Sequence, residues 1–305
     1  MSYVLRSWTG RLGLVLVGIM VVSALVSLAW TPHDPTEVVP SERWQSISWS
    51  HPFGTDGGGK DLLSQVLVGA RTTLLVAVAA AALAALVGLV LGIASGILPR
   101  YVGESLAYFI DVLIALPTLI LALVFVAALG GSVWTVSLAI GVASGVVLAR
   151  VVKAEVTRVL IQDYVVAAAA SGSSTWRTIW RHVIPNIAST VIVQVSLIAA
   201  LAVLAEAALS YLGLTPVSTP SWGRMLSELQ STVTVHPASL IFPGLAVIGA
   251  TLGFNLLGDA LRDAIDPRLR SSAAAVSPEI AARVDRVEAV PGAPAGTAAP
   301  TEVVP

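Results

Sequence analysis

Long, uninterrupted runs of apolar residues set the pattern of this chain. A helix needs about 20 apolar residues to cross the hydrocarbon core of a bilayer. Segments of this kind occupy roughly 12–30, 73–98, 106–129, 133–150, 188–212 and 239–260. In lipid every backbone polar group must be paired internally, so such runs predict helices and not open strands. The pattern therefore predicts an all-α membrane protein with six transmembrane helices.

Composition agrees with the bilayer as the main solvent. Hydrophobic residues make up 56% of the 305 residues and charged residues only 11%, whereas a soluble domain carries about 25% charged residues. The net charge of -1 argues against a nucleic-acid partner. The absence of cysteine excludes a disulfide framework and a thiolate metal site.

The distribution of basic residues predicts the orientation of the bundle. The first apolar run follows Arg6 and Arg11 and is too long for a typical signal peptide, which predicts an uncleaved signal anchor despite a weak cleavage-like site at 27–29. With the N-terminus inside, few of the 17 Lys and Arg residues fall in outer segments: Arg43, Lys60, Arg71 and Arg224. Because basic residues resist translocation, both termini are expected in the cytoplasm.

Small and ionisable residues within the spans carry two further expectations. Gly88, Gly92 and Gly96 repeat every fourth residue on one helix face, a pattern that favours tight helix packing over a pore lining. Asp111 and Asp259 lie near span ends, whereas Glu206 lies deeper. A charged group inside the membrane is a functional candidate by default, so we single out Glu206.

The first outer loop, about 31–72, nearly spells a phosphate-binding loop. Gly54, Gly59 and Lys60 have the required spacing, but Asp61 stands where Ser or Thr would hold Mg²⁺. We therefore favour a glycine-rich turn over a nucleotide site. In the second outer loop, about 213–238, Trp222 suits an interfacial position, and no pair of histidines or carboxylates there has metal-ligand spacing. We expect no metal or cofactor in this chain.

The insert at 151–187 is a surface that folding alone does not require. Gly172 interrupts a helix-prone stretch, and a second helix can begin behind Ser173 or Ser174. Within that helix one face is predicted to gather Trp176, Ile179, Trp180 and Val183. Pro185 is expected to end it. The segment could lie flat on the inner leaflet or dock into a groove of a cytoplasmic partner, and these alternatives stay open on physical grounds.

A resemblance rests on this insert and on three other segments. Ala167, Ala168, Gly172 and Pro185 have the spacing of the cytoplasmic loop of ATP-binding-cassette importer permeases. Segments 51–71, 206–223 and 255–268 also resemble the dipeptide/oligopeptide branch of that family, in particular its second, "C"-type permease. The likeness spans most of residues 1–270. The Ala/Pro/Gly-rich tail at 271–305 lies outside it and is expected to be disordered.

The resemblance implies a type I importer permease fold and a role in peptide uptake. The domain organisation expected is an N-terminal anchor and outer loop at 1–72, a core permease at 73–270 and the tail at 271–305. Partners would be a second permease subunit, two cytoplasmic ATPase subunits that bind ATP and Mg²⁺, and an extracytoplasmic peptide-binding protein. The chain would lie in a bacterial cytoplasmic membrane and have no catalytic residues. Nickel or haem-like cargo is the alternative substrate class.

The insert would act as the coupling helix that docks on an ATPase. The residues expected to carry coupling are Asp163, Tyr164, Val165, Val166, Ala167, Ala168, Gly172, Trp176, Arg177, His182 and Pro185. Candidates for an extracytoplasmic or gating role are Gly54, Thr55, Asp56, Glu206 and Trp222. The family usually has Glu where this chain has Val166, so docking is expected to rest on packing, or on Asp163 or Arg177.

Two other functions compete with transport. An intramembrane protease needs a Ser–His or paired-Asp site at bilayer depth, whereas all four histidines of the chain fall in predicted loops. A non-transporting membrane scaffold would explain a docking insert but not the Gly54-Thr55-Asp56 segment. The sequence therefore favours the permease.

Overall fold

The computed structural model describes residues 7–216 and 219–265, and in these ranges it contains helices and no strand. The predicted tail lies outside the described residues. Contacts define one compact unit from Met1 to Arg262, with a separate unit from Asp263 onward. The helices are α1 (Trp8–Ala29), α2 (Leu62–Ile97), α3 (Arg100–Ile114), α4 (Thr118–Leu129), α5 (Val133–Leu160), α6 (Asp163–Ala170), α7 (Thr175–Thr178), α8 (Ile184–Tyr211), α9 (Trp222–Leu229) and α10 (Ala238–Ile265).

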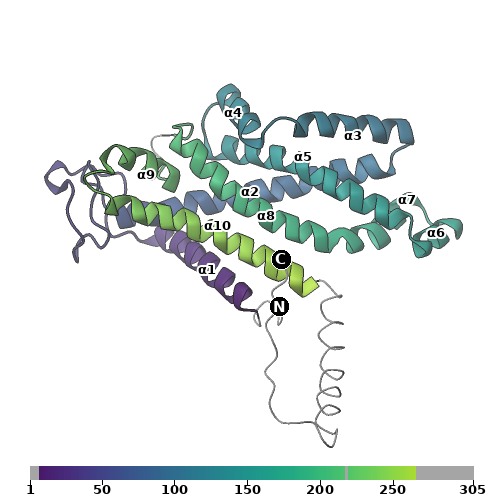
Figure 1. The fold of residues 1–305 in the computed structure, drawn as a ribbon, viewed down its shortest axis with the longest axis horizontal. Helices are drawn as coiled ribbons and strands as arrows, with labels where there is room; N and C mark the ends of the chain where they lie inside the picture. The colour runs from purple at the N-terminus through teal and green to yellow at the C-terminus, as the bar shows by residue number, and fades with distance from the viewer. Residues whose placement is uncertain (1–6, 217–218, 266–305) are drawn as a thin grey trace, which may run out of the picture. The chain divides into compact units, whose positions relative to one another are not determined.

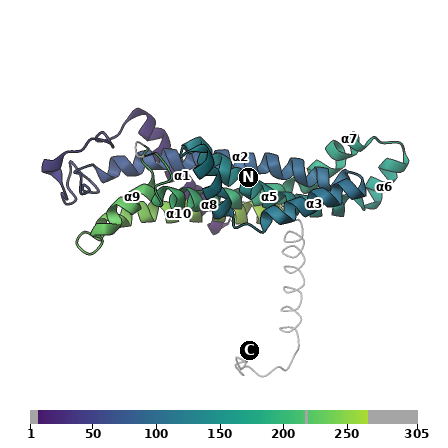
Figure 2. The ribbon, with the colours of Figure 1, turned by 90° about the horizontal axis from the view of Figure 1, so that it is seen from above.

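The long helices form a bundle in which α2, α5 and α8 lie side by side (Figure 1). Helices α6 and α7 lie at one end of this bundle, whereas α9 lies at the other end (Figures 1 and 2). The segment between α1 and α2 lies at the same end as α9. These ends are called the α6–α7 end and the α9 end below.

Five of the described helical stretches are long and apolar enough to cross a membrane. They are α1, α2, α5, the stretch Thr175–Tyr211 and α10. The predicted span at 106–129 is not one continuous helix, because α3 and α4 meet at a bend of 87°, and the bent pair together is long and apolar enough to count as a sixth span. Pro117 lacks a backbone N–H and disfavours helical geometry at Leu116, so the apolar run continues while the helix does not.

Close contact between α2 and α5 explains the glycine repeat. A Cβ on Gly88 would lie 2.6 Å from Leu148 of α5, and one on Gly92 would lie 2.5 Å from Val152. Gly96 faces Val156 in the same way, at 2.8 Å. Each glycine thus receives a branched side chain of the neighbouring helix, which lets the two backbones approach closely. The predicted packing role is confirmed.

Candidate functional site at the two ends of the bundle

The turn between α6 and α7 is fixed by backbone hydrogen bonds. Gly172 has φ +85°, its N–H donates to Ala169 O at 3.0 Å, and the Ser173 N–H donates to Ala168 O at 3.1 Å. This paired bonding is a Schellman motif, which needs a left-handed residue at the position of Gly172. The predicted interruption at Gly172 is therefore a defined sharp turn.

Helix α6 is held on the bundle by one apolar side chain. Val165 is buried and belongs to a core cluster with Val159 of α5, Val183 just before α8, and Ile187 of α8. Its side chain therefore faces the core, although it stands among the residues expected to mediate coupling. Val165 therefore sets the position of α6 and is itself covered by the bundle.

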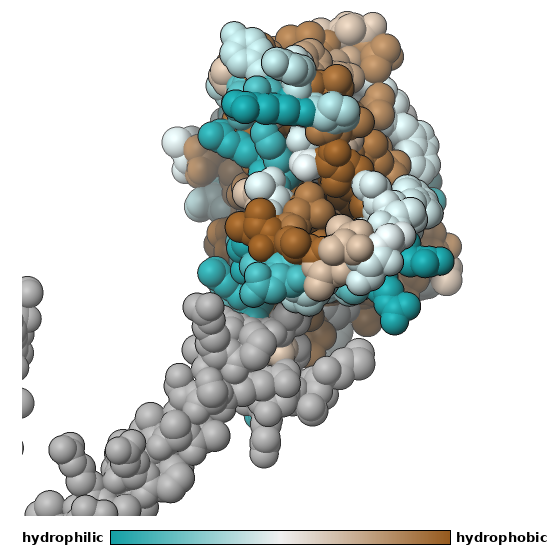
Figure 3. Space-filling model, turned by 90° about the vertical axis from the view of Figure 1, so that its right-hand side faces the viewer, coloured by the Kyte–Doolittle hydropathy of each residue, from teal (hydrophilic) through white to brown (hydrophobic). Residues whose placement is uncertain are grey.

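The outward side of this segment is apolar and aromatic. Tyr164, Val166, Trp176 and Trp180 are all exposed, and the two indole rings meet edge to face with centroids 5.6 Å apart. Figure 3 looks onto this end and shows apolar surface bordered by polar residues. Large exposed apolar patches on proteins mark binding surfaces. We call Tyr164, Val166, Trp176 and Trp180 the aromatic patch.

Two expectations for the second helix of the insert are wrong. The helix does not end at Pro185, because a π-helical turn at Ile179–Val183 carries it into α8. In this turn the Ile184 N–H donates to Ile179 O, five residues back. The wider turn accommodates Pro185, which has no N–H and stands near the start of α8.

The π turn also divides the four residues that were predicted to share one face. Ile179 and Val183 are buried against the bundle, whereas Trp176 and Trp180 are exposed. A turn that spans more residues than an α-helical turn shifts the register of everything before it. Periodicity of 3.6 residues therefore could not place these side chains.

Polar residues of the insert stand at the starts of its two short helices and beside one aromatic ring. Asp163 stands in the first turn of α6, and the Arg177 N–H donates to the Ser174 side chain at 3.4 Å, which confirms Ser174 as the cap. The Tyr164 and His182 rings come together with centroids 5.9 Å apart. The contact of these two rings joins α6 to the π turn.

At the α9 end, the Gly54-Thr55-Asp56 segment is a buried turn. The Thr55 hydroxyl accepts from the Gln45 N–H at 2.8 Å and donates to Glu42 O. A Cβ on Gly54, which has φ +77°, would lie 2.6 Å from Gln45 O. Because these groups are paired within the loop, they form a structural turn rather than a surface available to a ligand.

The same turn excludes a phosphate from the glycine-rich loop. The amides of Gly58 and Lys60 both donate to Asp56 Oδ1, at 2.7 Å and 3.0 Å. The amides that would cradle an anion in a phosphate loop are thus occupied by an internal carboxylate. The interpretation as a glycine-rich turn is the one that the geometry supports.

Glu206 ties α8 to α2 through a buried polar network. Its Oε2 accepts from the Thr73 hydroxyl at 2.9 Å, and its Oε1 accepts from Ser210 at 2.7 Å. Thr215 donates to Ser210 at 3.1 Å and extends the network to the segment after α8. Thr73 and Ser210 were not predicted from the sequence, because nothing local relates residues 133 positions apart.

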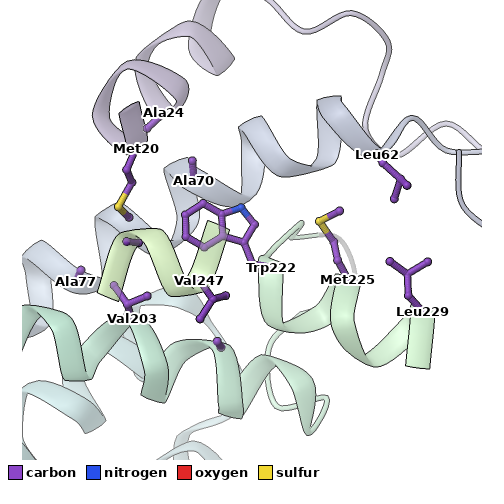
Figure 4. Packing of buried hydrophobic residues seen from close by; sticks show 12 residues of the cluster. Met20, Ala24, Leu62, Ala70, Ala77, Val203, Trp222, Met225, Leu229 and Val247 are labelled. Carbon is purple, nitrogen blue, oxygen red and sulfur yellow. The ribbon is translucent and has the colours of Figure 1, made fainter. Parts of the chain in front are cut away.

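Trp222 is buried rather than interfacial. Its Nε1 donates to Val66 O at 2.9 Å, and its ring packs in a cluster with Met20, Ala70 and Val247 (Figure 4). Trp222 belongs to α9, and the other residues of its cluster include members of α1, α2, α8 and α10. Residue type predicted a position at the membrane interface. The ring is instead buried beside Gly69, where there is room for it because a Cβ at position 69 would lie 2.6 Å from the ring.

A histidine–carboxylate cluster at the α9 end was not predicted. His33, His51 and Asp61 come from three separate stretches of the loop, and their ligand atoms lie within 4.8 Å of one another. Their sequence spacing follows no metal-binding pattern. Only the folding of the loop over the start of α2 brings them together.

A helical bundle with several spans and an exposed helical insert at one end is the architecture of a membrane permease. The model of the family described as binding-protein-dependent transport system inner membrane component matches residues 88–271, which include α5, the insert and α8. The chain belongs to this family. It is therefore a multi-pass membrane protein of the permease type.

Similar curated proteins cover most of the chain. The dipeptide transport system permease protein DppC of Alkalihalophilus pseudofirmus is 34% identical over 264 residues, covering 85% of this chain and 87% of that protein. OppC of Bacillus subtilis, an oligopeptide transport system permease, is 32% identical and covers 85% of each chain. A putative peptide transport system permease of Brucella suis is 36% identical, covering 87% of this chain and 90% of its own length.

Proposed function

We propose that this chain is one of two permease subunits of an ATP-driven importer for dipeptides or oligopeptides. The observation that carries the proposal is the exposed aromatic patch on a rigidly held turn at the end of a family-matched bundle. The similar proteins named for dipeptide and oligopeptide transport support peptide as cargo. The chain supplies half of the pathway and no catalytic group.

The α6–α7 end is cytoplasmic in this proposal, and the aromatic patch docks on an ATPase subunit. Val166 is exposed where a family Glu would offer a charge. Docking therefore relies on apolar and aromatic contact, which salt screens less than an ion pair. A partner with a groove lined by apolar side chains fits this surface.

Helix α8 transmits the movement of the docked segment. The helical stretch Thr175–Tyr211 runs without a break from the insert to Glu206 and Ser210 at the other end. A shift of the insert therefore moves the hydrogen bonds between α8 and α2. ATP drives transport if the ATPase pair binds it more tightly in one of the two resulting conformations.

Reconstitution tests the proposed function. The chain is placed in nanodiscs with its second permease and ATPase subunits, and ATP hydrolysis is measured with and without the loaded binding protein. A peptide-loaded binding protein should stimulate hydrolysis, whereas one loaded with Ni²⁺ or haem should not. An intact complex that shows no stimulation by peptide contradicts the proposal, and stimulation by Ni²⁺ or haem alone would assign the alternative cargo.

A charge in the aromatic patch tests the docking mode. Tyr164→Asp should weaken ATPase binding about tenfold or more, since it removes an aromatic ring and places an unpaired carboxylate in an apolar contact. The matched control is Thr157→Asp, which adds the same charge at an exposed position of α5. ATPase pull-down at two salt concentrations provides the measurement. Equal binding by both variants would mean that the patch is not the docking surface.

A further inference from the structure

We propose that His33, His51 and Asp61 form a binding site for a divalent transition-metal ion of the zinc class. The site lies in the loop between α1 and α2, and its existence does not depend on the proposed function. Asp61 Oδ1 lies 3.0 Å from His51 Nδ1 and 3.9 Å from His33 Nδ1. Donor atoms bound to one tetrahedral ion at about 2.0–2.1 Å stand roughly 3.4 Å apart, so these distances are close to those of a chelate.

His51 is buried between two carboxylates. Only 3% of the His51 side chain is exposed, and carboxylates face both ring nitrogens: Asp61 at Nδ1 and Glu42 at Nε2, 3.5 Å away. Carboxylates at both ring nitrogens suit either an imidazolium with two N–H groups or a neutral ring with a metal ion on Nδ1 and its Nε2–H toward Glu42. The ligand atoms of Asp61 and His33 lie within 4.8 Å of those of His51 and would complete the metal site.

Groups around the three ligands hold them in place. Asp61 Oδ2 accepts from the Ser64 N–H at 2.8 Å and from its hydroxyl at 2.7 Å, which leaves Oδ1 to face the histidines. The Ser64 hydroxyl also accepts from the His33 N–H at 3.0 Å. Glu42 faces the second ring nitrogen of His51, and a carboxylate in this position commonly orients a metal-bound histidine. The ligands thus have the orienting partners that metal sites use.

One side-chain movement accompanies binding. The His33 and His51 rings are stacked, with centroids 4.5 Å apart and an angle of 23° between planes. A metal ion lies in the plane of each ring that binds it, so the stack must open. The His33 side chain is 41% exposed, which gives it room to turn, whereas His51 and Asp61 stay fixed.

The ligand set selects the class of ion. Two imidazole nitrogens and one carboxylate suit Zn²⁺, Ni²⁺, Cu²⁺ or Co²⁺, whereas Mg²⁺ and Ca²⁺ prefer oxygen ligands. Three protein ligands leave one position of a tetrahedral ion for water. A bound ion would fasten the loop to the start of α2, because Asp61 is the residue that caps that helix.

Metal titration of the full chain tests the site. Tag-free protein in nanodiscs, stripped with EDTA, is titrated with Zn²⁺ by calorimetry, and Co²⁺ absorption reports the ligand geometry. One equivalent of Zn²⁺ should bind, excess Mg²⁺ should not compete, and Co²⁺ should give tetrahedral bands. His33→Gln should weaken binding at least about tenfold, and Glu42→Gln should weaken it by about tenfold through His51.

Two control variants separate loss of a metal ligand from loss of the helix cap and from binding elsewhere on the chain. Asp61→Asn keeps a residue able to cap α2, so a loss of metal in that folded variant reflects the lost carboxylate. His182→Gln removes a histidine at the opposite end and should bind Zn²⁺ as the parent does. If the parent binds no more Zn²⁺ than His33→Gln, the cluster is a hydrogen-bonded His–Asp pair with a proton at Nδ1, and the metal proposal is wrong.

Discussion

At the residue scale, the buried carboxylates of the described bundle are hydrogen-bonded, whereas Thr251 Oγ1 is a buried polar atom without a partner. Glu206 is 1% exposed and meets two hydroxyl groups from two helices. Asp56 and Asp61 each use both oxygens, with partners in the loop and in the first turn of α2. Burying a charged group away from water costs free energy unless the group is hydrogen-bonded. The hydrogen-bond partners of these carboxylates therefore contribute to the stability of the fold.

Loss of the Glu206 acceptor should destabilise the protein. Glu206→Leu leaves the Thr73 and Ser210 hydroxyls without this partner and should cost about 1–3 kcal/mol. Glu206→Gln keeps one acceptor oxygen and should cost less. Thermal unfolding in nanodiscs measures both, with Glu228→Gln, at an exposed pair with Arg224, as control. Equal melting temperatures for the Leu variant and the control would show that the network adds nothing to stability.

Gly92 gives a second test at this scale. A Cβ there would lie 2.5 Å from Val152 Cβ and 2.7 Å from Ala149 O, so Gly92→Ala should force α2 and α5 apart at a cost of about 1–3 kcal/mol. Gly18 of α1 meets no atom within 4 Å, and Gly18→Ala should be neutral or slightly stabilising. A Gly92→Ala protein that unfolds at or above the parent temperature contradicts the packing role.

At the scale of elements, the insert is a helix pair whose shape comes from two backbone features. Gly172 supplies the left-handed residue of the turn, and Pro185 fits next to a π turn that joins the second helix to α8. The presence of two helices and the break at Gly172 were predicted correctly. The continuation through Pro185 was not, because a π turn has no sequence signature as clear as a proline.

Substitutions at Gly172 should act through backbone strain alone. A Cβ there would meet nothing within 4 Å, so Gly172→Ala costs about 1–2 kcal/mol for the left-handed conformation and causes no clash. Gly172→Asn should cost less, since Asn adopts this conformation more readily. Hydrogen exchange of the 171–178 amides should rise more in the Ala variant. Peptide-stimulated ATPase activity should also fall further in the Ala variant than in the Asn variant. Unchanged hydrogen exchange in both variants would contradict the left-handed turn at Gly172.

At the scale of the whole molecule, the absence of cysteine allows a direct test of orientation. Trp49 is fully exposed at the α9 end, and Ala170 is exposed at the α6–α7 end. Cysteine is introduced at either position, and intact cells are treated with a membrane-impermeant maleimide. Trp49→Cys should be labelled and Ala170→Cys should be labelled only after permeabilisation. The reverse pattern would invert the proposed orientation.

The sequence by itself determined the membrane class, most of the spans, the insert and the family resemblance. These depend on the length of apolar runs and on local turn residues, which act over a few positions along the chain. Tertiary structure decided the burial of Trp222 and the meeting of Glu206 with Thr73. It also decided the cluster of His33, His51 and Asp61. Such contacts join residues as far apart as Trp222 and Val66, 156 positions away, and only the packing of helices specifies which distant groups meet.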